Sequence, residues 1–337
     1  MKCTSKKRTL ASLTCMALVS AVFLQGCGSL SYEMAYDADS NVSSFNVISK
    51  EDTRTAAPYA ASLCVVTGDV TEGTSADLSG VTAALLCDLN DHEAICAKNA
   101  HGTLAPASIT KVMTALVALR YSDRNQVLTA SSAVTIQESG VTLCGLKPGD
   151  TMTLDQALRI LLVYSANDVA LLIAENVGGS VEGFVELMNQ EAHRLGATNT
   201  HFTNPHGLTD ANHFTTAYDL YLIFNEAIQN ETFSEIIQMT SYQTVYYDKQ
   251  NKEKKFDKST SNGYLKGSCT APAGVTVIGG KTGTTKAAGN CIILLVRDVS
   301  GAPYVAVVMG ALTSDALYDT MNSLLKEVSG PAGQPSS

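Results

Sequence analysis

Two short apolar runs open the regular part of the chain. Residues 81–88 and 94–97 are apolar, and the turn-forming residues 90–93 separate them. A connection this short joins antiparallel strands, so the pattern predicts a hairpin.

A long helical region follows the hairpin. Pro106 suits the first turn of a helix, because an N–H at that position would have no acceptor within the helix. Apolar residues then recur at helical spacing. These apolar residues are Ile109, Val112, Met113, Leu116 and Leu119. Further helices are predicted over 154–163, 168–177, 181–195 and 218–229.

Strands return toward the C-terminal end. The charged residues 249–258 predict an exposed loop. Apolar runs then predict strands over 290–297 and 304–312, and a final helix over 315–328. Strands on both sides of a helical middle indicate an α+β fold with one antiparallel sheet, because a parallel sheet would alternate strands and helices.

The first 27 residues have the pattern of an export signal. The basic start, residues 2–8, precedes an uncharged apolar stretch, 10–24, that is too short for a comfortable membrane span. The following Leu-Gln-Gly-Cys27 resembles a bacterial lipobox, in which the Cys27 thiol carries the lipid. Gln25 departs from the residue usual there, so cleavage by an ordinary signal peptidase is the alternative.

Composition excludes other classes of function. Removal of residues 1–26 leaves 19 basic against 32 acidic side chains, a net charge of −13, with no basic patch, so nucleic acid is not expected as a partner. The cysteines after Cys27 contain no Cys-x-x-Cys pair, and no His-Glu-x-x-His sequence occurs. No metal or other cofactor is therefore expected.

Cys87 and Cys96 lie on the two strands of the predicted hairpin. If the turn centres on residues 91–92, they stand directly opposite each other, at a Cβ separation of about 4.5–5.5 Å, slightly longer than a disulfide prefers. We therefore expect free thiols, although an exported protein permits oxidation.

Ser108-Ile-Thr-Lys111 places a hydroxyl and an amine on one helix face. Free N–H groups at the helix start favour an oxyanion, and burial would lower the pKa of Lys111 until its neutral amine takes the serine proton. The Ser-x-x-Lys motif alone is weak evidence for a nucleophile and its base, because a second copy runs from Ser323 to Lys326. Only Ser108 follows a proline at a helix start.

Two further polar motifs are candidates for the same chemistry. Ser165-Ala-Asn167 lies between two apolar helical runs and either caps a helix or lines a cleft. Lys281-Thr-Gly283-Thr284 follows two glycines that allow backbone to approach a ligand closely. Its lysine is either a partner for a carboxylate or a solvated surface charge.

The order Ser-x-x-Lys, Ser-x-Asn and Lys-Thr-Gly is that of penicillin-binding proteins and serine β-lactamases. Over residues 81–321 the chain resembles the low-molecular-weight D-Ala-D-Ala carboxypeptidases, serine peptidase family S11. The matching segments are 97–100, 105–115, 145–150, 201–208, 216–219 and 280–283. The resemblance implies a β-lactamase/transpeptidase-like fold, with an antiparallel sheet flanked by helices and a mainly helical subdomain.

The resemblance also implies a role for each motif residue. Ser108 would attack the penultimate D-alanine of a peptidoglycan stem peptide and form an acyl-enzyme, with Lys111 as general base and Ser165 relaying a proton to the leaving amine. The N–H groups of Ser108 and Thr284 would form the oxyanion hole, and β-lactam antibiotics would acylate the same serine. The substrate-binding residues that it implies are Asn167, Lys281, Thr282 and Thr284.

The chain is thus predicted to divide into four segments. These are a lipoprotein-type signal peptide over 1–26, a flexible tether over 27–60, a peptidase domain over 61–330 and a disordered tail over 331–337; the helical part of the domain covers roughly 120–250. The protein is predicted to be extracytoplasmic in a bacterium, either anchored to the membrane through lipid on Cys27 or secreted.

Other functions stay open on the sequence alone. A D,D-endopeptidase would use the same catalytic set. A class A-like β-lactamase needs a glutamate that activates water, and neither Glu175 nor Glu182 lies in the usual Glu-x-x-Leu-Asn context. A cell-wall-binding lipoprotein with a dead catalytic fold is disfavoured because all three motifs are intact.

The chain also departs from the family pattern. We expect no counterpart of the β-rich C-terminal domain of many relatives. The arginine that relatives often carry after the last strand is also missing, because no arginine follows Arg297. With Leu317 or a neighbour at that position, we expect the substrate carboxylate to be bound by Lys281 and the hydroxyls of Thr282 and Thr284.

Overall fold

The computed structural model describes residues 62–329. The predicted signal peptide, the tether, Cys27 and the predicted tail lie outside the described residues. Within the part that is described, no helix has both the length and the apolar character that crossing a membrane requires.

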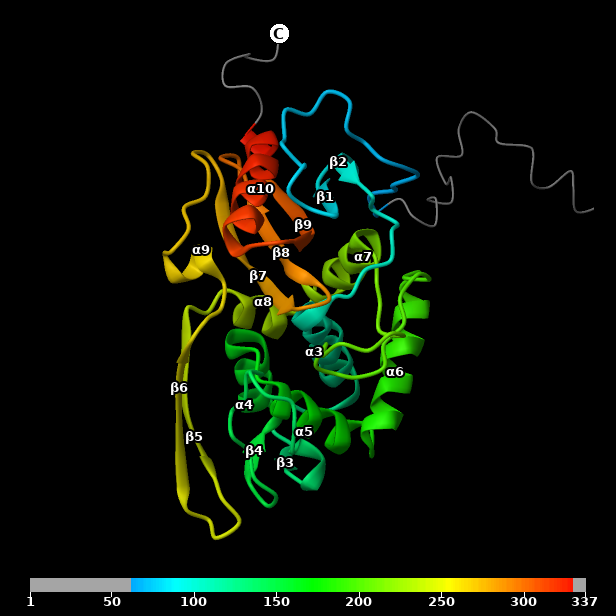
Figure 1. Cartoon of the computed structure of the whole chain (residues 1–337). Coiled ribbons are helices and arrows are strands. Elements are labelled where there is room, and N and C mark those ends of the chain that lie inside the picture. The colour runs from blue at the N-terminus through cyan, green and yellow to red at the C-terminus, as the bar shows by residue number, and fades with distance from the viewer. Residues whose placement is uncertain (1–61, 330–337) are drawn as a thin grey trace, which may run out of the picture. The chain divides into compact units, whose positions relative to one another are not determined.

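A five-stranded antiparallel sheet forms the upper part of the molecule in Figure 1, in the order β2-β1-β9-β8-β7. Its strands are β1 (Ala83–Asp88), β2 (Glu93–Lys98), β7 (Thr276–Thr285), β8 (Gly289–Arg297) and β9 (Pro303–Ala311). Alternate residues of each strand enter separate cores, since Leu85 and Ile293 pack on one face and Leu86 and Ile292 on the other. Burial of both faces explains why β1, β8 and β9 are nearly continuous apolar runs in the sequence.

One face of this sheet is covered by α10 (Ser314–Lys326), whose Met321 and Leu324 belong to the second core. The other face packs against α7 (Ala217–Ala227) and α8 (Glu231–Ile237), which contact β1, β7 and β9. Threonine caps begin two of these helices, because the Thr216 and Thr313 side chains accept backbone N–H groups in the first turn.

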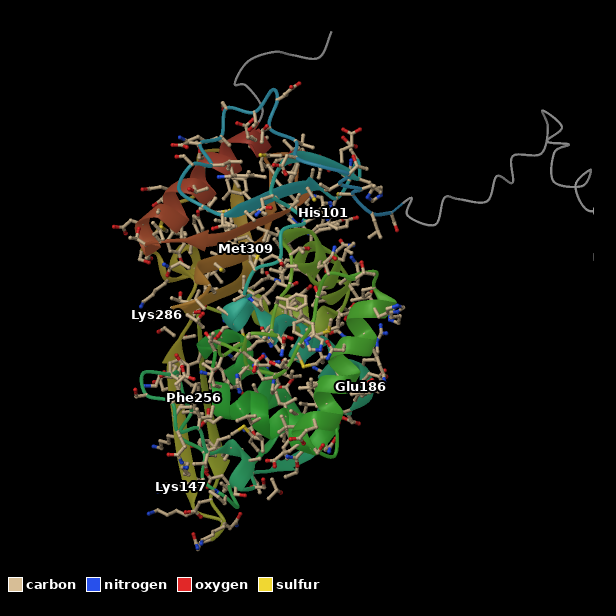
Figure 2. All side chains as sticks on the ribbon, turned by 45° about the vertical axis from the view of Figure 1, so that its right-hand side comes forward. His101, Lys147, Glu186, Phe256, Lys286 and Met309 are labelled. Carbon is tan, nitrogen blue, oxygen red and sulfur yellow. The ribbon has the colours of Figure 1, made fainter. Side chains whose placement is uncertain are left out.

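Four further helices form a helical region beside the sheet (Figures 1 and 2). They are α3 (Thr110–Tyr121), α4 (Leu154–Arg159), α5 (Asn167–Val177) and α6 (Val181–Arg194). The short α9 (Gly263–Lys266) lies apart from them, next to β7, and its Gly263 N–H donates to the Tyr318 hydroxyl of α10. A second sheet, in the order β3-β4-β5-β6, comprises β3 (Val127–Thr129), β4 (Thr151–Thr153), β5 (Ser241–Tyr247) and β6 (Glu253–Ser259). The predicted α+β fold, an antiparallel sheet flanked by helices with a helical subdomain, is confirmed. The expectation of one antiparallel sheet was wrong, because β3–β6 form a second one.

The prediction of an exposed loop over 249–258 was wrong. Residues 253–259 form β6, which pairs with β5 along its whole length and is labelled at Phe256 in Figure 2. Phe256 is the buried residue of this strand and the others are largely exposed, so the apolar alternation that marks a strand is missing. Backbone pairing forms the strand, and its charged side chains suit a sheet edge.

The hairpin of β1 and β2 has a register that differs from the prediction. A bulge between Leu86 and Cys87 places Cys96 opposite Leu86 and Cys87 opposite Ala94. The expectation that Cys87 and Cys96 stand directly opposite each other was therefore wrong, and their side chains enter different cores. That both are free thiols in the protein stays a prediction.

Candidate active site

The three sequence motifs meet where β7 passes the start of α3. Ser108 lies in a 3-10 turn, Ala107–Ile109, directly before α3, and Lys111 lies one turn further on. Lys111 Nζ is 2.8 Å from Ser108 Oγ, 2.7 Å from Asn167 Oδ1 and 2.7 Å from the His206 carbonyl oxygen. The structure thus joins the first two motifs through one buried amine.

The third motif joins them through a second buried amine. Lys281 Nζ donates to Ser165 Oγ at 3.0 Å and to the Thr282 carbonyl oxygen at 2.7 Å. Ser165 follows a π-helical turn, Ile160–Tyr164, and its φ of 71° is left-handed. A left-handed non-glycine residue persists only where surrounding contacts enforce it. Such residues, and π turns, are both frequent at functional sites.

Gly283 allows β7 to approach the predicted nucleophile. A Cβ atom at this position would lie 2.7 Å from the Ser108 nitrogen and 3.0 Å from Ala107 Cβ. Any side chain would push the strand away, so the glycine keeps the backbone of β7 beside the Ser108 N–H.

The two predicted threonine ligands lie on the same strand. The Thr282 hydroxyl is 2.6 Å from the Ser261 hydroxyl, and the Thr284 hydroxyl donates to Asn290 Oδ1 at 3.0 Å. Both hydroxyls are thus fixed by neighbours on the rim of the site.

Burial changes the protonation of both lysines. Lys111 is fully buried, and desolvation, reinforced by the charge of Lys281, holds its pKa well below the usual value, although Asp168 opposes the shift. Burial alone lowers the pKa of Lys281 to about 7. Near neutral pH one amine is therefore available as a base while the other retains much of its charge.

Some residues of the site were not predicted from the sequence. The His206 carbonyl holds Lys111, and the Asp168 carboxylate accepts the N–H groups of Cys144, Gly145 and Leu146, which ties a long loop to the start of α5. The site uses the backbone of His206, and no residue-type pattern marks a carbonyl group. From the sequence alone, Asp168 is expected only to place a favourable negative charge at the start of a helix.

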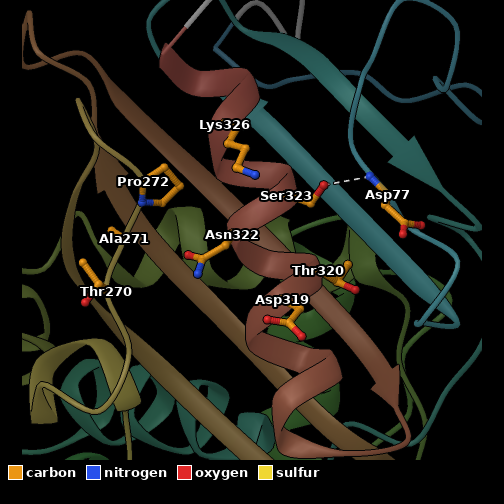
Figure 3. Close-up of a pocket in the computed structure, with 9 residues that line it drawn as sticks. All are labelled: Asp77, Thr270, Ala271, Pro272, Asp319, Thr320, Asn322, Ser323 and Lys326. Carbon is orange, nitrogen blue, oxygen red and sulfur yellow. Dashed lines mark hydrogen bonds between the residues drawn. The ribbon is translucent and has the colours of Figure 1, made fainter.

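The second Ser-x-x-Lys sequence lies elsewhere, on α10. Figure 3 shows Ser323 and Lys326 beside a pocket that segment 270–272 lines on its other side. Ser323 Oγ accepts the backbone N–H of Asp77 at 2.7 Å. Its hydroxyl thus anchors the chain before β1, as expected for an ordinary helix residue.

The structure also corrects the position assigned to the missing arginine. Leu317 is buried in the core between α10 and the sheet. It therefore does not face the site, and an arginine there would bury an unpaired charge. Leu317 itself is therefore not the counterpart of the missing arginine.

No group of three or more His, Cys, Asp or Glu side chains among residues 62–329 is placed to hold a metal ion.

The buried imidazoles near this site predict acid sensitivity. Burial lowers the pKa of His213 to about 4, although Asp210 raises it and His201 lowers it further. Below the ordinary histidine pKa of about 6.5 the unfolded chain takes up a proton that folded His213 refuses, so stability falls until about pH 4. At pH 5 this loss is about 2 kcal/mol, and His206, whose pKa burial lowers to about 3, adds to it.

Urea unfolding at pH 7 and pH 5 tests this acid sensitivity. The loss of unfolding free energy between the two pH values should be about 2 kcal/mol smaller in His213→Gln than in the wild type. Equal losses in both proteins would contradict it.

Comparison with known proteins identifies the family. The sequence model described as D-alanyl-D-alanine carboxypeptidase, peptidase family S11, matches residues 71–313, and this protein belongs to that family. The chain is 33% identical over 237 residues to the D-alanyl-D-alanine carboxypeptidase DacF of Bacillus subtilis, covering 68% of this chain and 57% of that protein. It is 38% identical over 154 residues to DacB2 of Mycobacterium tuberculosis, covering 45% and 52%. The match thus spans little more than half the length of these curated relatives.

Solved structures share the fold. The Streptomyces K15 DD-transpeptidase is 24% identical, with a TM-score of 0.68 over 73% of this chain and 96% of that one. A D-alanyl-D-alanine carboxypeptidase from Mycobacterium tuberculosis is 28% identical, with a TM-score of 0.66 over 77% and 94%. The first likeness concerns the fold alone. Together the two structures show that the chain has the β-lactamase-like fold.

Proposed function

We propose that this protein is a serine D-Ala-D-Ala carboxypeptidase, which removes the terminal D-alanine from peptidoglycan stem peptides and is acylated by β-lactams. The observation that carries the proposal is the contact of Lys111 Nζ with Ser108 Oγ inside a site where a second buried lysine holds Ser165. The names of the relatives point to the same substrate.

The surroundings of Lys111 suit a general base. A neutral amine has two N–H bonds and one lone pair, and the Asn167 and His206 oxygens are two acceptors at 2.7 Å. If they take both hydrogens, the lone pair faces Ser108 Oγ and receives its proton as the oxygen attacks the carbonyl carbon.

The first half-reaction then follows from the geometry. The new C–O bond leaves a negative charge on the carbonyl oxygen, and the N–H groups of Ser108 and Thr284 stabilise it; removal of one such donor typically costs about 3 kcal/mol. When the C–N bond breaks, the proton from Lys111 passes through the Ser165 hydroxyl to the departing D-alanine amine. Asn167 and β7 hold the peptide during this step, and Lys281 orients Ser165.

The second half-reaction regenerates the enzyme. Water attacks the ester on Ser108 and gives a proton to Lys111, which passes it to Ser108 Oγ as the C–O bond breaks and the shortened peptide leaves. A β-lactam follows the first half-reaction but keeps its leaving nitrogen attached, so it stays on Ser108 for longer.

The assay uses a tripeptide that ends in D-Ala-D-Ala. We expect release of one D-alanine per peptide and a mass increase of one penicillin on the intact chain. A protein that releases no D-alanine and takes up no penicillin would contradict the proposal, and cleavage of a cross-linked muropeptide instead would establish the endopeptidase alternative.

The β-lactamase alternative has little structural support. The Glu175 carboxylate accepts the N–H and hydroxyl of Ser131, and Glu182 lies exposed in the first turn of α6. Neither glutamate is therefore seen in contact with Ser108 among the hydrogen bonds of the described residues. Rapid multiple turnover of penicillin would favour that alternative nevertheless.

We further propose that the chain is exported and held at the bacterial membrane by lipid on Cys27. The basic start, the apolar stretch over 10–24 and the Leu-Gln-Gly-Cys27 sequence support this proposal. Two acyl chains would give stable anchoring where one is marginal.

Replacement of Cys27 by alanine should release the protein from the membrane fraction or leave it as an unprocessed precursor. Fractionation of cells and mass spectrometry of the mature N-terminus measure this, with Cys64→Ala as a matched control that should stay membrane-bound. An unmodified N-terminus downstream of Cys27 in the wild type would rule out the lipoprotein.

A further inference from the structure

The segment over residues 201–213, which follows α6, packs along the face of α3 that carries the site. The hydroxyl of Thr114 donates to the Pro205 carbonyl at 2.6 Å, and Lys111 donates to the His206 carbonyl. Gly207, with a φ of 85°, lies so close to the turn before α3 that a Cβ atom would come within 1.8 Å of the Ala107 oxygen. This segment therefore braces the turn that contains Ser108.

That turn contains an unusual backbone conformation. Ala107, directly before Ser108, has a left-handed φ of 48°, which an alanine adopts only where its surroundings enforce it. Its carbonyl oxygen accepts two hydrogen bonds from Thr110, one from the backbone N–H and one from the hydroxyl at 2.8 Å. The direction of this carbonyl fixes where the next residue begins, and hence where Ser108 points.

His213 completes the contact from the other side. Its ring is buried, and the backbone N–H of Thr203 donates to Nδ1 at 3.0 Å, so Nδ1 must be an acceptor. The hydrogen of the neutral ring is then on Nε2, which is 2.9 Å from the Thr110 hydroxyl. Because that hydroxyl donates its own hydrogen to Ala107, it accepts from Nε2, and the chain of donors runs from Thr203 to Ala107.

We propose that His213 is a positioning residue for the nucleophile. It fixes the Thr110 hydroxyl, which in turn holds the Ala107 carbonyl in the left-handed turn that aims Ser108 Oγ at Lys111. This role rests on the proposed serine-peptidase function but concerns a side chain that makes no contact with Ser108 or Lys111 among the hydrogen bonds of the described residues.

The test measures the rate constant for acylation by a fluorescent penicillin. His213→Leu removes the Nε2–H donor and should slow acylation by about 100-fold, the effect of moving a reacting atom by roughly 1 Å. His213→Gln offers an amide N–H in its place and should stay within about fivefold of the wild type. A residue that only supports folding would change the melting temperature without slowing acylation of the folded protein.

Thr110 provides the second arm of the test. Thr110→Val should slow acylation as much as His213→Leu, whereas Thr110→Ser keeps the hydroxyl and should remain near the wild type. The double variant His213→Leu/Thr110→Val should be no slower than either single variant, because both break the same chain of contacts. If His213→Leu does not fold, the comparison of Thr110→Val with Thr110→Ser decides the question.

His201 is a matched control in the same segment. It is exposed and its Nδ1 contacts the Asn212 carbonyl oxygen, so His201→Leu should acylate within about twofold of the wild type. NMR of ring nitrogens gives a readout without catalysis, since His213 should carry its hydrogen on Nε2 at pH 7.

Three results would overturn the positioning role. They are wild-type acylation in folded His213→Leu, equal rates for Thr110→Val and Thr110→Ser, or a hydrogen on Nδ1 of His213. A wild-type protein that penicillin does not acylate would instead overturn the proposed function.

Discussion

Ser108→Ala is expected to abolish covalent labelling by penicillin, while Ser323→Ala leaves labelling intact. Both serines start a Ser-x-x-Lys sequence, so motif alone does not distinguish them. Ser108 Oγ lies 2.8 Å from the fully buried Lys111 amine, whose pKa burial holds well below the usual value. Ser323 Oγ is instead engaged with the N–H of Asp77 on the far side of the sheet from that amine.

The expected loss is large because the nucleophile and its base act as one unit. Loss of the serine in a comparable hydrolase costs about 10⁶-fold in kcat, so release of D-alanine should fall below detection. Intact-mass measurement after incubation with penicillin and a steady-state peptide assay measure both consequences. A thermal melt of each variant serves as the folding control. Persistent labelling of folded Ser108→Ala would remove the whole mechanism.

Most of the helices and the central strands could be predicted because residues that are buried at regular spacing are apolar in the sequence. The short α8 and α9 were not predicted. The strands over 290–297 and 304–312 are apolar on both faces, and the structure places β8 and β9 within a residue of those bounds. β6 escaped prediction because its partner strand, rather than a buried face, stabilises it. β7 was not predicted as a strand, and only its Lys-Thr-Gly motif was recognised. Its glycines permit contacts with Ser108 and α8 that no local sequence feature records.

Much of the site was predictable for a different reason. The residue types of Ser108, Lys111, Ser165 and Lys281 are dictated by the proton transfers they are suited to, and these side chains do lie together. What sequence did not reveal is how they are held. The left-handed backbone at Ala107 and Ser165 depends on contacts from segments far along the chain, which only the fold brings near.

Lys281→Met should lower kcat/KM for a D-Ala-D-Ala tripeptide by about 100- to 1000-fold. The sequence prediction assigned Lys281 to the substrate carboxylate, and the structure adds that its buried amine holds Ser165 Oγ at 3.0 Å. Methionine keeps most of the volume but removes the charge and the donor, so the loss measures electrostatic stabilisation rather than packing. Lys266→Met, on α9, is the matched control for the loss of one cation and should keep near-normal kcat/KM.

The role of Lys281 also predicts the direction in which kcat/KM changes with pH. Burial lowers the pKa of Lys281 to about 7, so its charged form prevails below pH 7 and is lost as the pH rises through that value. If the charge is needed, kcat/KM of the wild type declines on the alkaline side with an apparent pKa near 7, and Lys281→Met lacks this decline. The same substitution removes a cation that lowers the pKa of Lys111, so the acid limb, where Lys111 becomes protonated, should move to higher pH. Near-normal kcat/KM in Lys281→Met, or an unchanged alkaline limb, would show that another cation receives the carboxylate.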